Sequence, residues 1–454
     1  MGSTWLGRLA SPLALVGAAV GVGVLAGIDP PLAIAAALSL LFVLVVFADL
    51  AVGLAVFTVL SFAAQIPALE GSFLSLSKIA GLLLAISWLA TLATRQDARS
   101  EFSAAHPGLT YVLVVFVAWV ALSQLWAADS GNALSALARL TLNAILFLIV
   151  YSAVRTPKQA IWLIAAFIAG ACLDALYGLL FVSSEPGRLE RLTSSINNPN
   201  ELASILVAAL ALSLGLAGAL RRVPLGRLAA LAATALCGAG IFLTGSRGGL
   251  VGLGVALAAF LVVGTKWRAR IFVIAIVLGF VGLGYFEYVA SPDVRAHVST
   301  VGSGTGRLDL WTVGWRMVEA NPVVGVGAGN FPVSSVHYLL QPGAIERGDF
   351  FVGTPKVTHN SYLEVWAELG IVGLVLFVTI LAFCVRSALR AARAFADGDF
   401  QMEFISRAVF VALVGMLATD FFGSREYAKE LWLLLALAPA LLAMARSHRH
   451  LTRA

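Results

Sequence analysis

The chain of 454 residues is 60% hydrophobic and 12% charged, and its mean hydropathy is +0.93. Soluble domains carry about 25% charged residues, so this composition excludes an ordinary soluble protein and indicates a polytopic membrane protein. The net charge of +6 is spread over many short loops and forms no basic face, which argues against nucleic acid as a partner.

Long apolar runs predict the fold class. A hydrocarbon core about 30 Å thick requires about 20 apolar residues of a helix, and the runs are too long and too uniform for the short, alternating strands of a membrane barrel. We therefore expect an all-α polytopic membrane protein with about 12 to 14 transmembrane helices in a single domain over residues 1–454. The candidate spans are 9–28, 31–48, 51–66, 76–94, 109–126, 133–152, 160–182, 200–219, 226–244, 248–264, 270–290, 360–385, 402–422 and 428–446.

Arg8 is the only charged residue before the first apolar run, residues 9–28, and further spans follow the run at once. It lacks a convincing cleavage site, so we expect a retained helix and not a removed signal peptide.

Basic residues predict the orientation of the spans, because Lys and Arg accumulate in cytoplasmic loops. They are concentrated on alternate connections, within 95–99, 155–158, 221–227, 266–270, 386–393 and 446–453. This pattern places both termini in the cytoplasm. The long polar segment 291–359 then lies on the outer face, where it forms the one large loop of the protein.

Within this outer loop, residues 306–320 are expected to form a short amphipathic helix. Leu308, Trp311, Trp315 and Val318 recur at helical spacing, and Asn321-Pro322 should end the helix, because proline disfavours the helical region at the residue before it. Such a helix could lie in the membrane interface or pack on the mouth of the bundle, and the sequence favours neither. The glycine run at 325–330 follows no strand and lacks the spacing of a dinucleotide site, so it predicts a bend.

His359 is the strongest candidate for chemistry. In T-H-N-S-Y-L-E, Ser361 and Glu364 have the spacing of a capping box that would start the next span at Tyr362. The positive end of that helix disfavours imidazolium, so a neutral ring facing water could serve as a general base. The alternative is an ordinary surface histidine. Glu364 is more naturally a capping residue than an acid.

Several outer arginines are candidate anion-binding residues. Arg247 lies in F-L-T-G-S-R-G-G-L, close to hydrocarbon, where an arginine is usually partnered or functional and can clamp a phosphate; the alternative is snorkelling to the interface. Arg188 and Arg191 precede S-S-I-N-N-P-N-E-L, in which Asn200 could cap the next helix. For Arg425 an ion pair with the adjacent Glu426 is the default expectation.

We expect neither a metal nor an organic cofactor. The outer-face carboxylates are scattered, and no pair has the spacing of a metal site. The three cysteines lie inside apolar runs, where a thiol behaves as a small hydrophobe, so neither a disulfide framework nor a zinc site is expected.

Two segments together resemble a known family. G-R-L-D-L-W-x3-W-R-M-x3-N-P-V-V-G-V-G-A-G-N-F, followed by H-N-S-Y-L-E-V-W-A-E-L-G-I-V-G-L, is similar to the O-antigen ligase and Wzy polymerase superfamily of the bacterial inner membrane. The segments T-G-S-R-G-G-L and R-L-T-S-S-I-N-N-P-N-E-L-A also fit. The resemblance covers about a third of the chain. Fourteen spans exceed the twelve usually described for ligases.

The resemblance implies a metal-independent glycosyltransferase of the C type, with an active site that faces the periplasm. Its donor would be a glycan on undecaprenyl diphosphate, and no nucleotide sugar would be needed. By position, His359 would be the base that deprotonates the acceptor hydroxyl, and Arg247 and Arg191 would hold the donor diphosphate. Arg188, Arg307 and Arg425 are further candidates for diphosphate contacts.

The resemblance leaves the acceptor glycan open. A ligase would use lipid A-core, a Wzy-type polymerase a second lipid-linked repeat, and other branches a protein or secondary polymer; the ligase is slightly preferred. From other classes, a lipid-linked oligosaccharide flippase or a non-catalytic scaffold remain alternatives. A transporter usually places its polar residues near the bilayer midplane, whereas the arginines here lie at the outer ends of the spans. Membrane lipids are expected partners in every case.

Overall fold

The structure is a computed structural model that describes residues 12–63, 73–94, 96–181, 191–193, 198–264, 268–299, 306–340, 345, 348–353, 356–396 and 398–451. In these ranges every regular element is a helix, so the all-α prediction is confirmed. The elements are α2 (Pro12–Ile28), α3 (Pro30–Ala48), α4 (Leu50–Ala63), α5 (Phe73–Thr94), α6 (Gln96–Ala105), α7 (Pro107–Leu122), η2 (Ser123–Leu125), α8 (Ser130–Ala153), α9 (Pro157–Phe181), α10 (Pro199–Ala219), α11 (Pro224–Leu243), α12 (Arg247–Val263), α13 (Arg268–Gly284), η3 (Tyr285–Val289), α14 (Pro292–Ser299), α15 (Arg307–Ala320), α16 (Phe331–Ser334), η4 (Ser335–Tyr338), α17 (Asp349–Val352), α18 (Ser361–Phe395), α19 (Phe400–Thr419), η5 (Asp420–Phe422) and α20 (Lys429–Leu451).

Each of the candidate spans overlaps at least one of these helices, and residues 9–11, 64–66 and 182 of the spans lie outside the described residues. Eight of the described helices are long and apolar enough to cross a membrane, namely α7 to α11 and α18 to α20. The apolar parts of α2, α4, α5, α12 and α13 are shorter, at 10–17 residues. The chain is therefore a polytopic membrane protein.

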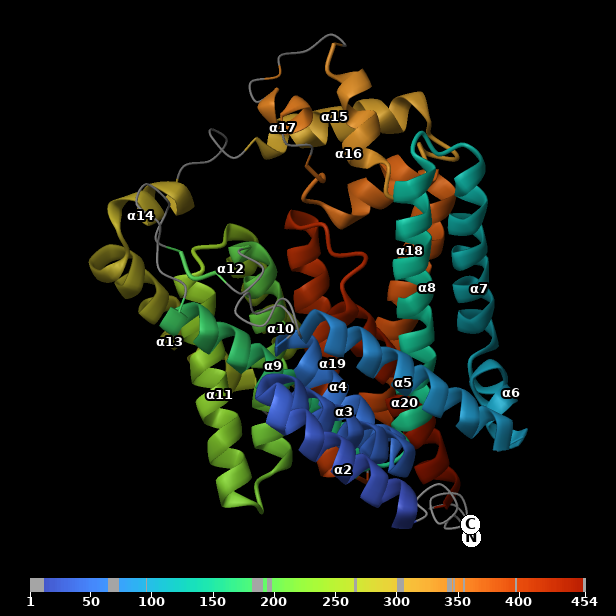
Figure 1. Ribbon diagram of the computed structural model, residues 1–454. Coiled ribbons are helices and arrows are strands. Elements are labelled where there is room, and N and C mark those ends of the chain that lie inside the picture. The colour runs from blue at the N-terminus through green and yellow to red at the C-terminus, as the bar shows by residue number, and fades with distance from the viewer. Residues whose placement is uncertain are drawn as a thin grey trace.

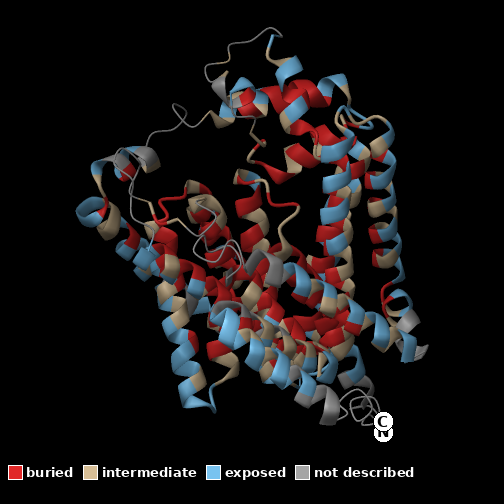
Figure 2. Cartoon of the chain, in the orientation of Figure 1, coloured by how far each residue is buried: buried red, intermediate tan, exposed pale blue. Residues whose placement is uncertain are grey.

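The helices form one bundle around α10. In Figure 2 buried residues gather in the middle of the bundle, and exposed residues follow the outward faces of α7, α8 and α11. Those faces are apolar, since Val114, Leu142 and Leu228 are all exposed, as is expected of surfaces in contact with lipid. Small residues bring the inner helices close together: a Cβ on Gly252 of α12 would lie 2.1 Å from Thr419 of α19.

The segment between α13 and α18 lies at one end of the bundle. Figure 1 shows α15, α16 and α17 together at the top of the view, with α6, the start of α2 and the end of α20 at the opposite end. Helix α15 ends at Ala320 with Asn321 as its C-cap, so the predicted stop before Pro322 is confirmed.

Helix α15 packs on the bundle through a face that overlaps the predicted one in part, since Val318 is 3% exposed and Trp311 packs against the same cluster. Leu308 and Trp315 are 58% and 48% exposed, whereas Leu310, Val313 and Met317 are fully buried. The helix approaches α18 most closely at a glycine: a Cβ on Gly314 would lie 3.0 Å from the Leu363 side chain. Of the two alternatives for this helix, the structure therefore shows the packed one.

The glycine run forms the predicted bend, with positive φ at Gly325, Gly327 and Gly329. The bend is attached to α18. Val326 N–H donates to the carbonyl oxygen of Ala367 at 3.0 Å, and Gly327 N–H donates to that of Glu368 at 2.8 Å. These contacts are possible because α18 is kinked at Gly370, where φ is 66°.

The Glu368 side chain completes this attachment. Its carboxylate accepts the N–H groups of Gly329 at 2.7 Å and Phe331 at 2.9 Å. On the other side of the bend, Asn330 accepts the N–H of Asp129, at the turn before α8, at 2.7 Å. The bend is thus held between two helices that lie far apart in the sequence, and it fixes the end of α15 above the bundle.

Candidate active site

The turn between α11 and α12 places two of the candidate arginines. Leu192 N–H donates to the carbonyl oxygen of Leu243 at 2.9 Å, which seats the segment before α10 against this turn. Arg191 then donates from Nε to the carbonyl oxygen of Thr244 at 2.7 Å. Ser246 caps α12, and its side chain accepts the N–H of Gly249. Arg247 is therefore the first residue of α12, at the end of the helix where anions are favoured.

Asn200 connects Arg191 to the start of α12. The prediction that Asn200 caps the next helix is wrong. The N-cap of α10 is Asn198, with Pro199 as the first helical residue, a position that proline favours because no N–H is needed there. Asn200 is left free to accept Ser246 Oγ at 2.7 Å and the Arg191 guanidinium at 3.5 Å. Its side chain therefore links Arg191 to the start of α12.

Three arginines from different parts of the chain act on one another electrostatically. The pKa of Arg191 is lowered to about 10, first by burial and then by the nearby charges of Arg307 and Arg247. Burial, followed by the charge of Arg247, also lowers the pKa of Arg307. Arg307 reaches this place because it is the first residue of α15, after Gly306 in the left-handed conformation. Such a gathering of cations favours an anion with several negative charges.

His359 lies beside this arginine group. Its pKa is lowered from 6.5 to about 4, first by burial and then by the charges of Arg307 and Lys356. At neutral pH the imidazole is therefore uncharged and able to accept a proton. Sequence reasoning reached the same protonation state from the helix dipole, but the larger cause is burial. Lys356 was missed, because a lysine in a polar loop carries no distinctive pattern.

The backbone at His359 is strained. Its φ is 54°, a left-handed value that it alone adopts among the described residues other than glycine. Strain of this kind persists when the surroundings fix it, and it is common at functional sites. Here the neighbours on both sides are fixed. Thr358 O accepts the Trp311 indole N–H at 3.1 Å, and Asn360 N–H donates to Thr358 Oγ1 at 3.0 Å.

The capping box predicted for Ser361 and Glu364 is wrong by one residue. Asn360 is the N-cap of α18, and its side chain accepts the N–H groups of Tyr362 and Leu363. Ser361 instead donates to the carbonyl oxygen of Gly423 at 2.9 Å. Glu364 is buried and accepts the hydroxyl of Thr358 at 3.0 Å, so it holds the residue before His359 and not the helix terminus.

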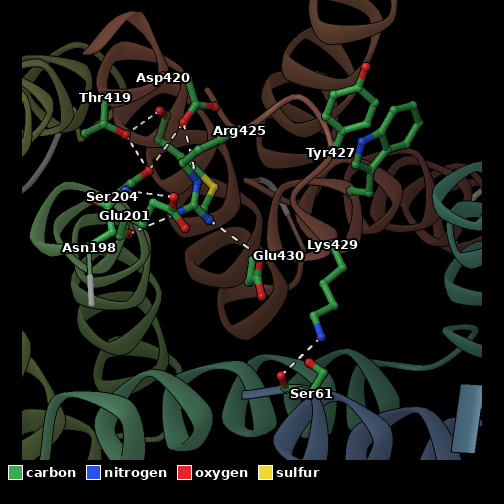
Figure 3. A network of polar contacts seen from close by, with 12 residues as sticks. Ser61, Asn198, Glu201, Ser204, Thr419, Asp420, Arg425, Tyr427, Lys429 and Glu430 are labelled. Atoms are coloured by element: carbon green, nitrogen blue, oxygen red, sulfur yellow. Dashed lines mark hydrogen bonds and ion pairs between the residues drawn. The ribbon is translucent and has the colours of Figure 1, made fainter. Parts of the chain in front are cut away.

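Arg425 lies in a separate, buried network, which Figure 3 shows from close by. Its guanidinium is 3.8 Å from Asp420 and 3.5 Å from Glu430, and it donates to the carbonyl oxygen of Glu201 at 2.9 Å. The expected ion pair with Glu426 is therefore wrong, although the two residues are adjacent in the chain. The Arg425 side chain is 3% exposed. These contacts tie the end of α19 to α10 and α20.

Arg316 of α15 is buried and donates to the carbonyl oxygen of Tyr338 at 2.7 Å. Arg188 lies outside the described residues. Among the residues that the structure describes, no group of three or more His, Cys, Asp or Glu side chains could hold a metal ion.

Comparisons with known proteins point to one family. Residues 232–378 match the family model described as O-antigen ligase. An O-antigen ligase of Pseudomonas aeruginosa is 29% identical over 281 residues, which are 60% of this chain and 63% of that protein. The aligned part thus spans less than two thirds of that relative. The matched family region includes Arg247, Arg307 and His359.

Proposed function

We propose that the chain transfers a glycan from undecaprenyl diphosphate to an acceptor hydroxyl at the periplasmic face of the bacterial inner membrane. Its similarity to the O-antigen ligase family supports this proposal. The observation that supports this most strongly is the gathering of Arg191, Arg247 and Arg307 beside an uncharged His359. A diphosphate ester is the kind of anion that several guanidinium groups bind, and a neutral imidazole is the kind of base that an acceptor hydroxyl requires.

In the proposed reaction, the three arginines hold the donor diphosphate. His359 removes the proton of the acceptor hydroxyl, whose oxygen attacks the anomeric carbon from the face opposite to the diphosphate. The bond between that carbon and the diphosphate oxygen breaks, the lipid diphosphate leaves as an anion, and the configuration at the anomeric carbon is inverted. The arginines stabilise the charge that develops on the leaving group.

Arg188 is proposed as a further contact of the donor, because it is close in sequence to Arg191. Arg425 is not included in the proposed site, because its guanidinium is occupied by Asp420 and Glu430. The same proposal places both termini in the cytoplasm. Arg386, Arg390 and Arg446 support this orientation, because they line one pocket with Ala105 at the end of α6. Helix α6 lies at the end of the bundle away from α15, and basic segments remain in the cytoplasm.

The proposed acceptor is lipid A-core, with a second lipid-linked repeat as the alternative. The full chain, reconstituted with an undecaprenyl diphosphate-linked repeat, would be offered each acceptor in turn. Product on lipid A-core alone supports the ligase. Elongated lipid-linked product alone would show that the chain is a polymerase.

The role of His359 requires a substitution that preserves the backbone. Asparagine tolerates the left-handed conformation better than alanine does, so His359→Asn removes the base with the least disturbance. We expect transfer to fall by about 10²–10⁴-fold. His337→Asn is the matched control, because His337 is an exposed histidine of the same loop. Full activity in His359→Asn, or lipid translocation without transfer, would contradict the proposal, and translocation would favour a flippase.

A further inference from the structure

A pocket lies at the end of the bundle opposite to the candidate active site. It is formed where α6 meets α7, together with the last turns of α18 and the later part of α20. Its lining includes Arg386, Arg390 and Arg446 together with His106 and Ser387, and no Asp or Glu is among the residues that form it. A pocket lined by three guanidinium groups without a carboxylate favours an anion.

The three arginines converge from two helices. Arg386 and Arg390 are four residues apart on α18, so they lie one above the other on the same face. Both are exposed to solvent at the rim of the pocket, as is Arg446 of α20. Arg446 is held in place, since it donates to the carbonyl oxygen of Ala105 at 3.1 Å. Planar guanidinium groups arranged in this way match the oxygens of a phosphate.

The start of α7 adds donors and an unsatisfied polar group. Pro107 and Gly108 open this helix, and no side chain caps it, so the first N–H groups of the helix lack intrahelical acceptors. His106 is 8% exposed, and its Nε2 atom has no hydrogen-bond partner in the described part of the chain. Buried polar atoms without a partner are rare in proteins and call for an explanation, such as a ligand or an ordered water.

The pocket adjoins helix surfaces that face lipid. On α18, Val375, Val378 and Phe383 are exposed and precede Arg386 at helical spacing. On α7, Tyr111 is 71% exposed. The two helices meet at the pocket, where a Cβ on Gly108 would lie 3.2 Å from the Phe383 ring. An apolar surface that ends in a basic pocket suits a molecule with acyl chains and an anionic headgroup.

We propose that this pocket binds the phosphate of an anionic phospholipid, whose acyl chains lie along the exposed faces of α7 and α18. The ligand chemistry is a phosphodiester, held by Arg386, Arg390 and Arg446 and by the N–H groups at the start of α7. A free phosphate would satisfy the same polar groups but would leave the adjoining apolar faces unused. This site is independent of the transfer reaction, because it lies at the other end of the spans.

The test measures binding of phosphatidylglycerol to the purified full chain in detergent by native mass spectrometry. Arg386→Gln and Arg390→Gln should each weaken binding by about fivefold, the typical effect of one basic residue at an anionic membrane surface. Arg393→Gln is the matched control: Arg393 is an exposed arginine of the same helix end and does not line the pocket. It should leave binding within about twofold. The melting temperature without lipid shows that each variant is folded.

Two further arms identify the ligand. Phosphatidylcholine, whose headgroup has no net charge, should bind at least about fivefold more weakly than phosphatidylglycerol. Sodium phosphate at the same concentration as the lipid should not displace it. The proposal is overturned if Arg393→Gln weakens binding as much as Arg386→Gln does, if phosphatidylcholine binds equally well, or if sodium phosphate displaces the lipid.

Discussion

Replacing Arg307 by glutamine tests the electrostatic link between the arginine group and His359. The pKa of His359 is about 4 because the ring is buried and because Arg307 and Lys356 are nearby, in that order of importance. Since burial is the larger cause, removing Arg307 should reverse only part of the change. We expect the pKa to rise from about 4 to about 5, which corresponds to about 1.4 kcal/mol of interaction between the two groups.

The sign of the pH dependence follows from these values. Above pH 4 the folded protein holds the ring neutral, whereas the unfolded chain protonates it below about pH 6.5. Between these values the unfolded state binds more protons, so the free energy of unfolding decreases as the pH falls. Transfer by a neutral base should likewise be lost as the pH falls through about 4 in the parent protein and through about 5 in Arg307→Gln.

The direct measurement is NMR titration of labelled histidine in the full chain, which contains six histidines. The His359 signal is identified by its absence in His359→Asn. Arg295→Gln, which removes an equal charge from α14, is the control and should leave the His359 pKa unchanged. A parent pKa near 6.5 would refute the reasoning, as would an equal change in the Arg295→Gln protein.

Four further outcomes test the arrangement. Gly370→Ala should lower the free energy of unfolding by at least about 2 kcal/mol, because φ is 66° there and a Cβ would lie 2.0 Å from the carbonyl oxygen of Val323. The control Gly254→Ala, whose Cβ would meet no atom within 4 Å, should change it by less than about 0.5 kcal/mol. Equal melting temperatures of the two variants would contradict this prediction. Arg191→Lys should raise KM for the donor about tenfold in the reconstituted assay, because lysine lacks the planar fork. Glu364→Gln keeps an acceptor for the Thr358 hydroxyl, so we expect more than about a tenth of the transfer rate to remain; a loss as large as that of His359→Asn would instead indicate an acid. Transfer should persist in EDTA, and loss that added metal restores would count against the proposed mechanism.

The sequence predicted the helices well because a span is defined by the length of an apolar run, which is a local property. The first and last residues of the helices were predicted less accurately. At the start of α18, Asn360 and Ser361 are both good capping residues. Asn360 is the cap because Ser361 is engaged by a distant segment: its hydroxyl donates to Gly423 O and accepts the N–H of Arg425 at 2.7 Å.

The candidate site was predicted only in part, because local sequence pattern does not contain its long-range contacts. Arg247 and His359 could be identified from their places at the ends of apolar runs. The role of Glu368 could not, because its partners Gly329 and Phe331 lie almost forty residues earlier in the chain. The partners of Arg425 were also missed: Glu430 is five residues away, yet the adjacent Glu426 suggested a simpler pair. Local pattern identifies which residues lie at the ends of the helices, whereas long-range packing decides which of them meet.

The double attachment of the glycine bend has a consequence for biosynthesis. The bend joins the turn at Asp129 to the carboxylate of Glu368, and the ribosome delivers these two residues well apart in time, since chains are made from the N-terminus. A nascent chain that has not yet inserted α18 has no second anchor for residues 325–331. The candidate site is therefore among the last parts of the protein to be assembled, because it is complete only once α18 is in place.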